Sequence, residues 1–323
     1  MLYIETEGES FERGHAVGKS AAGIFARMVE DYKNIFSEEG WGWDMVRAHV
    51  QKYFPHCSSL SAYGELRGMA SGSGISEDDL FILNCAEEVF DMKSCTSIAK
   101  KTEGGVLLGH NEDWYASDET HVIVIGARRR GEPCFLSATC GAFLASVGLT
   151  DSLAQGVNSV SPKDVREGIP RVFVSRAVLD ANTSHEALEL ATMGNRAGGY
   201  NHLIATSDTI FSVETSATRH DILYGNQAHT NHYLSEKMRA IEKERSESSV
   251  RRYEGASFLL KEAGSVEDFK NILSDHTCGI CSHGREEKTV FSCIVDIGKA
   301  TLHVCEGNPC EGKWRQFSLR EYS

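Results

Sequence analysis

The chain has 323 residues, of which 41% are hydrophobic and 24% are charged, and its formal net charge is −13 at pH 7. This size and composition predict a soluble protein with one large core or two medium ones. The excess of acidic residues would repel a phosphate backbone, so we expect no nucleic-acid partner. No run approaches the ~18 apolar residues of a membrane span, so we expect no membrane partner either.

The first residues and the cysteines bear on the compartment. The stretch MLYIETEGES carries Glu5, Glu7 and Glu9 where a secretory signal would have a basic start and an apolar run. We therefore expect a cytoplasmic protein. Its ten cysteines are then expected to be thiols, because the cytoplasm keeps such residues reduced.

In chain order, the first third is predicted to be helical. Residues 11–36 place apolar side chains three and four positions apart, which indicates a helix with one buried face. Ser76 and Asp79 form an S-x-x-D capping pattern ahead of an apolar run. We expect a second helix to begin near Glu77 and to end before Lys93.

After Cys95, short β-rich runs alternate with turn residues. Three hairpins are predicted, formed by CTSIA with GVLLGHN, by HLIAT with IFSVET, and by FSCIVDI with TLHVCEG. Residues 169–193 predict two helices, the second capped by Thr183 or Ser184, and residues 236–263 predict another helical pair. The mixed charges of that last pair indicate a face exposed to solvent. Alternating blocks without a repeat or a linker predict a layered α+β domain.

The first hairpin predicts which residues meet at its open end. If the turn centres on residues 103–105, the pairing places Cys95 opposite residues 112–114. Cys95 then lies beside the acidic stretch GHNED, with His110 nearby as a candidate base. A thiol becomes strongly nucleophilic as thiolate, so a neighbouring base would matter. The plain alternative is that Cys95 is a small buried hydrophobic residue and GHNED is a polar strand end.

Several motifs occur in a fixed order along most of the chain: FERGHAVGKSAAG, MASGSGISEDDLFILN, SCTSIA, GHNEDW, AQGVNSV, GGYNHLIA, SVETS, HTNHYL and VFSCIVDIGKATLHVCEGNPC. Together they resemble the autoproteolytic acyl-coenzyme A:isopenicillin N (6-aminopenicillanic acid) acyltransferase family. That family is related more distantly to penicillin V acylases and bile-salt hydrolases. The resemblance rests on the ordered set, because no single motif would suffice.

The resemblance implies an N-terminal-nucleophile hydrolase, with an α+β fold built as a four-layered αββα sandwich in a single domain, residues 1–323. Precursors of this kind cut themselves immediately before the nucleophile. Here the cut would fall between Ser94 and Cys95, and the propeptide-derived α fragment, residues 1–94, would stay associated with the catalytic β fragment, residues 95–323. The new α-amine of Cys95, with a reference pKa near ~7.7–8.0, could then accept the thiol proton.

Motif matching extends the resemblance to further site residues. Asp113 corresponds to the acidic residue of the family's N-x-D segment and would orient the Cys95 amine. Asn231 in HTNHYL matches the family's oxyanion donor, and Asn158 in GVNSV matches a second polar position of the oxyanion hole in the bile-salt hydrolases. One such donor can contribute ~2.7–4 kcal/mol to the transition state.

Three positions depart from the family pattern. Ser94 stands where a glycine usually eases the strained backbone of the acyl shift, so cleavage could be slower or absent. His110 stands where the relatives carry Arg or Gln, and we expect it to line the substrate pocket rather than to act as the base. Arg285, in GREEKTVF, lies close to the position of a family arginine, although the alignment offset falls on Glu286.

A stretch near the end raises a metal hypothesis. Residues 276–283, HTCGICSH, combine two cysteines with two histidines, and Cys293, Cys305 and Cys310 follow, a density of ligands that could hold Zn²⁺. A structural zinc site usually needs a second paired knuckle, whereas Cys293 and Cys305 lie in predicted strands. We therefore expect no metal.

These observations leave three hypotheses. The first is a cysteine-dependent amidase or acyltransferase that acts on a small N-acyl compound through a Cys95 thioester, without a resident cofactor, although a coenzyme A thioester could serve as acyl donor. The second is a non-catalytic, unprocessed small-molecule binding protein on the same scaffold. The third is a zinc-stabilised protein in which Cys95 is simply buried. Intact mass distinguishes the first two, because an unprocessed chain keeps its 35.5 kDa.

Overall fold

The computed structural model describes residues 1–90, 94–129 and 133–321. Lys93, before which the second predicted helix was expected to end, lies outside the described residues. The helix itself begins as predicted. It is α5 (Glu77–Asn84), and the Ser76 side chain caps it by accepting a hydrogen bond from the backbone N–H of Asp79.

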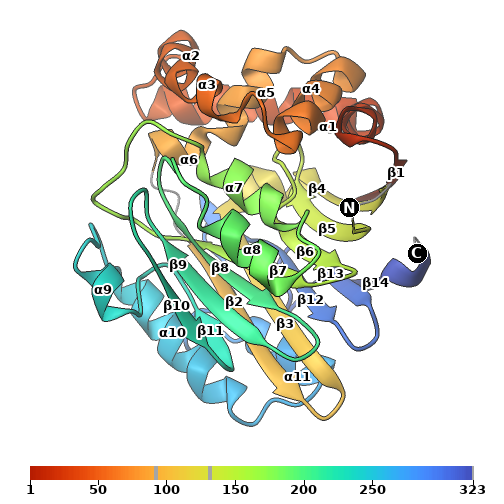
Figure 1. The fold of residues 1–323 in the computed structure, drawn as a ribbon, viewed down its shortest axis with the longest axis vertical. Helices are drawn as coiled ribbons and strands as arrows, with labels where there is room; N and C mark the ends of the chain where they lie inside the picture. Colours follow the sequence, from red (N-terminus) through yellow and green to blue (C-terminus); the bar gives the residue numbers. More distant parts are fainter. Residues whose placement is uncertain (91–93, 130–132, 322–323) are drawn as a thin grey trace.

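Two β-sheets form the centre of the molecule (Figure 1). In the described part of the chain, the larger sheet has eight strands, in the spatial order β1 (Leu2–Glu7), β4 (Val122–Arg128), β5 (Phe135–Cys140), β6 (Val147–Thr150), β7 (Ala154–Ser159), β8 (Tyr200–Ala205), β9 (Ile210–Thr215) and β10 (His220–Tyr224). The smaller sheet has six described strands, in the order β11 (Gln227–His229), β2 (Ser94–Thr102), β3 (Gly105–Tyr115), β12 (Glu287–Asp296), β13 (Thr301–Glu306) and β14 (Trp314–Ser318). Strands β2 and β3 pack against β7, so the two sheets face each other.

Helices cover the outer face of each sheet. On the larger sheet, α7 (Arg171–Val178) and α8 (Ser184–Ala191) enclose an apolar cluster with Ile204, Phe211 and Val213 of the strands. On the smaller sheet, α10 (Glu247–Leu260) and α11 (Val266–Leu273) enclose a second cluster with Ile98 and Ile294. Figure 1 shows the resulting order of layers, helix, sheet, sheet, helix, which confirms the predicted αββα sandwich.

The first part of the chain adds a group of helices at one end of the sandwich (Figure 1). They are α1 (Ser10–Glu38), α2 (Trp43–Val50), α3 (Phe54–Cys57), α4 (Ser61–Ser73), α5 and α6 (Ala86–Val89), with a 3₁₀ turn at Gln51–Tyr53. Helices α1 and α4 touch backbone to backbone, because a Cβ at Gly18 would lie 2.2 Å from the carbonyl oxygen of Met69 and one at Gly68 would lie 2.1 Å from that of Phe11. Only glycine permits so close an approach.

The residues before α1 form β1, which joins the larger sheet at its edge. Six residues, Leu2 to Glu7, pair in parallel with Ile123 to Arg128 of β4. The first part of the chain therefore contributes a strand to the sandwich as well as the helices at its end. Among the described residues, no helix is long and apolar enough to cross a membrane.

The predicted hairpins are confirmed as the antiparallel pairs β2–β3, β8–β9 and β12–β13. Helix α8 is capped by the Thr183 side chain, as predicted. The helical pair expected over residues 236–263 is α9 (Glu236–Arg239) and α10. The prediction that its charges face solvent is wrong for Arg252, which is only 2% exposed because α10 turns this residue toward the sheet, with Ala256 and Leu260.

Candidate active site

Cys95 is the second residue of β2, beside the open end of the β2–β3 hairpin. The ladder closes at Thr102 and Gly105, so Glu103 and Gly104 form the turn. This register places Cys95 opposite Glu112, inside the predicted range of residues 112–114, and it places Ser94 opposite Asp113. The predicted meeting of Cys95 with the acidic stretch is therefore confirmed, and the direct partner of the thiol is Glu112.

A chain of polar contacts begins at the Cys95 thiol. Its Sγ donates a hydrogen bond to Glu112 Oε1 at 3.3 Å, and Glu112 Oε2 lies 3.1 Å from His110 Nε2. His110 Nδ1 in turn lies 2.9 Å from Ser97 Oγ. The group in contact with the thiol is thus a carboxylate, and the imidazole contacts that carboxylate. Sequence reasoning named Glu112 as part of the acidic stretch without assigning it a role.

The surroundings of Cys95 favour its protonated form. Burial raises the pKa of the thiol well above its ordinary value, and the charges of Glu112 and Asp113 raise it further. A thiolate would lose hydration and face two carboxylates. A thiol in these surroundings forms a thiolate only if a neighbouring group accepts its proton, and Glu112 is in hydrogen-bond contact with it.

Asn231 and Arg252 hold the backbone of Cys95 from both sides. The backbone N–H of Cys95 donates to Asn231 Oδ1 at 3.1 Å, and Arg252 Nη2 donates to the same oxygen at 2.8 Å. Arg252 Nη1 donates to the Cys95 carbonyl at 2.7 Å and to Thr96 Oγ1 at 3.0 Å. Asn231 Nδ2 donates to the carbonyl of Ser159 at 3.1 Å. This network fixes the peptide units on both sides of the thiol.

Sequence reasoning missed Arg252, because it lies in a charge run that resembles a solvated face. A signal was present: Arg252, Ala256 and Leu260 follow one another at intervals of four and share one face of α10. An arginine on the apolar face of a helix requires buried acceptors. Here the acceptors are the Cys95 carbonyl and Asn231.

Asp113 is buried next to this network and carries an unsatisfied oxygen. Its Oδ1 accepts a hydrogen bond from Thr289 Oγ1 at 2.6 Å, whereas Oδ2 has no hydrogen-bond partner in the described chain. Burial raises the pKa of Asp113 to about 7, although the charge of Arg252 acts in the opposite direction. Such a carboxyl group would be stabilised in its charged form by a new cation beside it.

Asn158 is a second buried amide, and its donor nitrogen is unpaired among the described residues. It lies in β7 directly opposite Asn201, whose Nδ2 donates to Asn158 Oδ1 at 3.3 Å. The Nδ2 atom of Asn158 is buried without a partner in the described chain. By strand alternation its side chain shares a face with Gly156, where a Cβ would lie 3.1 Å from Ser97 Oγ of β2. Asn158 therefore faces the sheet that carries Cys95.

An apolar pocket adjoins Cys95. Its wall combines a few polar groups with many apolar ones, and the lining residues are Leu83, Glu87, Cys95, Glu112, Trp114, Ala138, Thr139, Cys140, Phe143, Leu144, Ser146, Val147, Val157, Ser159, Val172, Tyr200 and Phe291. Such a wall suits the apolar part of a small molecule. Leu83 and Glu87 precede Cys95 in the chain, so segments on both sides of the expected cut build the pocket.

Glu87 is a second carboxylate in the wall of this pocket, and sequence reasoning did not single it out. Tyr200 and Ser159 both donate hydrogen bonds to its carboxylate through their hydroxyl groups. Burial raises the pKa of Glu87 to about 7, against the opposing charge of Arg171. It offers the pocket a carboxyl group that changes charge near neutral pH.

Two predicted pocket residues lie elsewhere. His110 is fully buried and is not among the residues that line this pocket, and it reaches the site through Glu112. Arg285 is exposed in the segment before β12 and does not line the pocket either. The arginine that contacts the nucleophile candidate is Arg252, because α10 lies directly on β2 whereas residue 285 lies in a surface segment.

Comparison with known proteins identifies the family. A family model described as "Acyl-coenzyme A:6-aminopenicillanic acid acyl-transferase" matches residues 100–311. The chain belongs to this family. The resemblance seen in the ordered motifs is thereby confirmed, while the matched residues begin after Cys95.

A curated relative and two solved structures extend the comparison. The acyl-coenzyme A:6-aminopenicillanic-acid-acyltransferase 40 kDa form of Emericella nidulans is 23% identical over 337 residues, covering 95% of this chain and 94% of the relative. The penicillin V acylase from Agrobacterium tumefaciens has a TM-score of 0.52 at 14% identity, over 70% of this chain and 86% of that one. A variant of the conjugated bile acid hydrolase from Clostridium perfringens has a TM-score of 0.50 at 12% identity, over 69% of this chain and 97% of that one. These structures show that the family member has the N-terminal-nucleophile hydrolase fold.

Proposed function

We propose that the chain is an autoproteolytic amidase or acyltransferase that uses Cys95 as its nucleophile and acts on a small N-acyl compound. The observation that carries the proposal is the Cys95 thiol in contact with the Glu112 carboxylate at the edge of an apolar pocket. The family membership supports an acyl-transfer reaction. The matched relative is named as an acyltransferase of 6-aminopenicillanic acid.

The first step is cleavage before Cys95. Glu112 takes the thiol proton, and Sγ attacks the carbonyl carbon of Ser94. The bond from that carbon to the Cys95 nitrogen breaks, the nitrogen takes a proton, and a thioester joins Ser94 to Sγ. Water then hydrolyses the thioester, which leaves a carboxylate on Ser94, a free thiol and a free α-amine on Cys95. Asn231 and Arg252 support this step by holding the peptide units beside the thiol.

The free α-amine then serves the enzyme in turnover. It can accept the thiol proton during attack on the substrate carbonyl. Its protonated form would lie near Asp113, whose Oδ2 is unsatisfied and whose pKa of about 7 would fall beside a cation. Asp113 is therefore proposed to position the amine, and Glu112 to remain in contact with the sulfur.

Acyl transfer needs donors for the oxyanion and a site for the acyl group. The side-chain amide of Asn231 contacts Cys95 through Oδ1 and keeps one N–H besides the one that it donates to Ser159, and the unsatisfied Nδ2 of Asn158 faces the sheet of Cys95, so we assign both as donors. The apolar wall formed by residues such as Trp114, Phe143 and Phe291 would hold the acyl chain. Water or an amine then takes the acyl group from Cys95, and a coenzyme A thioester could supply it.

Cleavage is proposed to leave the two fragments together as one functional unit, with residues 1–94 and 95–323 as its parts. Leu83 and Glu87 line the pocket from the first fragment, and β1 pairs with β4 of the second. A pocket built from both fragments would lose part of its wall if they separated. The proposed function therefore requires a nicked chain that stays assembled.

Denaturing electrophoresis and mass spectrometry test the proposal. Sharing the 35.5 kDa mass in proportion to length, wild type should give pieces of roughly 10 and 25 kDa, with Cys95 as the new N-terminus, and Cys95→Ala should give one band. Cys140→Ala is the matched control, since Cys140 also lines the pocket, and it should still cleave. A folded wild type that stays whole after long incubation would contradict the maturation step.

Ser94 motivates the competing function, an unprocessed binding protein. If wild type stays whole, Ser94→Gly shows whether the residue before the cut is the obstacle, because glycine accepts the strained backbone more readily. Cleavage in Ser94→Gly alone would indicate that the natural chain is a binding protein on an enzyme scaffold. Cleavage in both chains supports the enzyme.

A further inference from the structure

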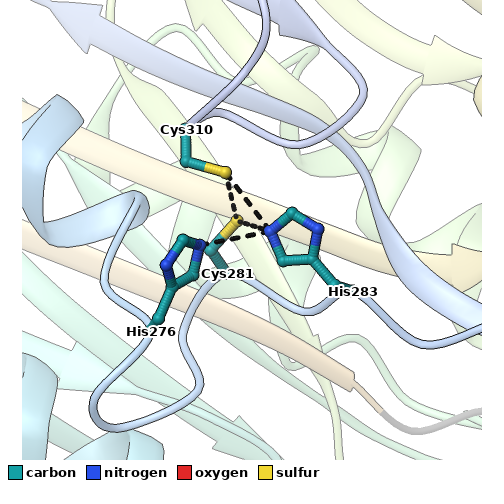
Figure 2. Close-up of side chains that lie close together, drawn as sticks. All are labelled: His276, Cys281, His283 and Cys310. Carbon is teal, nitrogen blue, oxygen red and sulfur yellow. Dashed lines mark hydrogen bonds between the residues drawn. The ribbon is translucent and has the colours of Figure 1, made fainter.

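Four metal-binding side chains converge at the surface, away from the pocket. Figure 2 shows His276, Cys281, His283 and Cys310 directed toward one another. Each of them offers one ligand atom, and these four atoms lie within 4.8 Å of one another. Cys281 is buried and the other three residues are exposed. The four residues are called the Cys₂His₂ cluster below.

Four of the six distances between the ligand atoms are close to those of a tetrahedron around one ion. The two Sγ atoms lie 3.6 Å apart, the two Nε2 atoms lie 3.1 Å apart, and His283 Nε2 lies 3.5 Å from Cys281 Sγ and 3.2 Å from Cys310 Sγ. With Zn–S bonds of about 2.3 Å and Zn–N bonds of about 2.0–2.1 Å, tetrahedral zinc sets about 3.8 Å between sulfurs, about 3.4 Å between nitrogens and about 3.6 Å between nitrogen and sulfur. These four distances differ from the tetrahedral values by a few tenths of an ångström, and His276 Nε2 lies within 4.8 Å of both sulfurs.

Two separate loops supply the cluster. His276, Cys281 and His283 lie between α11 and β12, and Cys310 lies between β13 and β14. The nearby Cys278 does not take part: its Sγ packs against α10, where a Cβ at Gly255 would lie 2.3 Å from it. The second pair of ligands therefore comes from His276 and Cys310, which the C-x-x-C pattern does not reveal.

A buried side chain supports the cluster from outside. Asn308 Nδ2 donates to Cys281 Sγ at 3.4 Å and to the carbonyl of Ser282 at 2.6 Å. The backbone N–H of Cys281 donates to the carbonyl of Asp275 at 2.9 Å. Donors aimed at a cysteine sulfur orient a thiolate and stabilise its charge, as in metal sites with a built second shell of contacts.

We propose that the Cys₂His₂ cluster binds one Zn²⁺ ion as a structural site. Two thiolates and two imidazoles in a tetrahedral arrangement suit zinc, and four protein ligands leave no position for a substrate. The ion joins the loop before β12 to the loop after β13. This proposal differs from the sequence-based expectation of no metal at these residues, and it is independent of the proposed function.

The zinc-bound loop continues into the candidate active site. The backbone N–H of Ser282 donates to Thr289 Oγ1 at 2.9 Å, and the same hydroxyl group donates to Asp113 at 2.6 Å. The loop has a second, independent anchor, because Asn111 Nδ2 donates to the carbonyls of Leu273 and Ile280. Zinc therefore stabilises a segment that supports Asp113, without being its sole support.

Metal content of the full-length, untagged protein tests the proposal directly. Protein purified without chelators should contain about one zinc ion per chain by plasma mass spectrometry, and the stripped protein should rebind one. Cobalt in place of zinc should give tetrahedral d–d bands and a thiolate charge-transfer band. In Cys310→Ser that charge-transfer band should fall to about half, since one of two thiolates is lost.

Matched variants separate the cluster from its neighbours. Cys310→Ser and His283→Ala should weaken zinc binding in a chelator competition by more than the roughly 10–100-fold expected for Asn308→Ala. Cys278→Ser and His220→Ala are the controls, one beside the cluster and one on an exposed strand, and both should bind zinc as wild type does.

Several results would overturn the proposal. They are a stripped wild type that fails to rebind zinc, iron in place of zinc in the purified protein, equal zinc loss in Cys278→Ser and Cys310→Ser, and a Cys281–Cys310 disulfide detected by peptide mapping. If Cys310→Ser fails to fold, the rebinding and cobalt spectra of wild type still decide the matter.

Discussion

Two groups of cysteine, histidine and acidic side chains place their ligand atoms within 4.8 Å of one another, and they are built in opposite ways. Cys95, His110 and Glu112 come from two paired strands, and hydrogen bonds join them in series from the thiol to Ser97. The Cys₂His₂ cluster comes from two loops, and three of its residues are exposed. The first arrangement suits proton transfer, because every contact is a donor facing an acceptor. The second places lone pairs around one point, which suits a cation.

Two paired strands and two neighbouring loops can thus bring reactive side chains equally close together and still suit different chemistry. This difference can be tested. Changes in the strand-built group should alter chemistry and leave zinc content unchanged, whereas changes in the loop-built group should do the reverse. Variants that keep Cys95 are therefore measured both for acylation and for zinc content.

The largest effect is expected for Asn231→Ala. Loss of one oxyanion donor should slow acylation of mature enzyme by about 10²–10³-fold while binding changes little. The measurement is the burst of p-nitrophenol from p-nitrophenyl hexanoate, with zinc content as the control readout. An unchanged burst rate would remove Asn231 from the mechanism.

The hydrogen-bond partners of Asn231 and Cys95 could be anticipated only in part. The hairpin register followed to within one residue from a turn centred on residues 103–105, and the observed two-residue turn at Glu103 and Gly104 then fixes every pair in the ladder. Arg252 could not be assigned, since its role depends on how α10 packs on β2. For the Cys₂His₂ cluster the sequence showed only a density of ligand residues, because His276 and Cys310 meet only after β12, β13 and β14 have folded side by side.

A change in the pH dependence of stability is expected for Asp113→Asn, tested in the Cys95→Ala background so that the chain stays whole. The folded pKa of Asp113, about 7, is raised above the ordinary 3.8, so its contribution to stability is full below pH 4 and is lost as pH rises through 7. Asparagine does not titrate, so the variant should not show this loss of stability, which should be on the order of a few kcal/mol in the background chain. Urea unfolding from pH 4 to pH 8 measures it.

The matched comparison for that experiment is Glu87→Gln in the same background. The pKa of Glu87 is also raised to about 7, so this variant should remove its own, separate loss of stability over the same range. If the free energy of unfolding of Asp113→Asn and of its background depended on pH in the same way, the pKa of Asp113 would not be raised in the uncut chain.

A smaller effect is expected for Arg252→Gln, with Arg285→Gln as its matched control. Glutamine cannot serve the acceptors on both Cys95 and Asn231, and a hydrogen bond to a charged donor contributes about 1.5–3 kcal/mol, so cleavage or acylation should slow by roughly 10–150-fold. The exposed Arg285 should change either rate by less than about 0.5 kcal/mol, or roughly twofold. If both variants slowed cleavage or acylation equally, Arg285 would have to be counted among the site residues.

The smallest effect on chemistry is expected from zinc removal. The stripped protein should unfold at a lower temperature, because an ion that binds only the folded state stabilises it. Its burst rate should change by less than about fivefold, since Asn111 still anchors the loop that supports Asp113. Loss of acylation on chelation, restored by zinc, would show that the two groups form one functional unit.

The pairing of β1 with β4 bears on the solubility of the two fragments after the proposed cleavage. The first fragment fills the edge of the larger sheet, and its departure would uncover β4, whose residues Val122–Ala127 are all buried. An uncovered apolar edge invites pairing with other chains. The cut chain would then stay soluble only while its two fragments remain paired. Separating the pieces should drive the larger one into aggregates, and soluble recovery should return when peptide 1–94 is supplied during refolding.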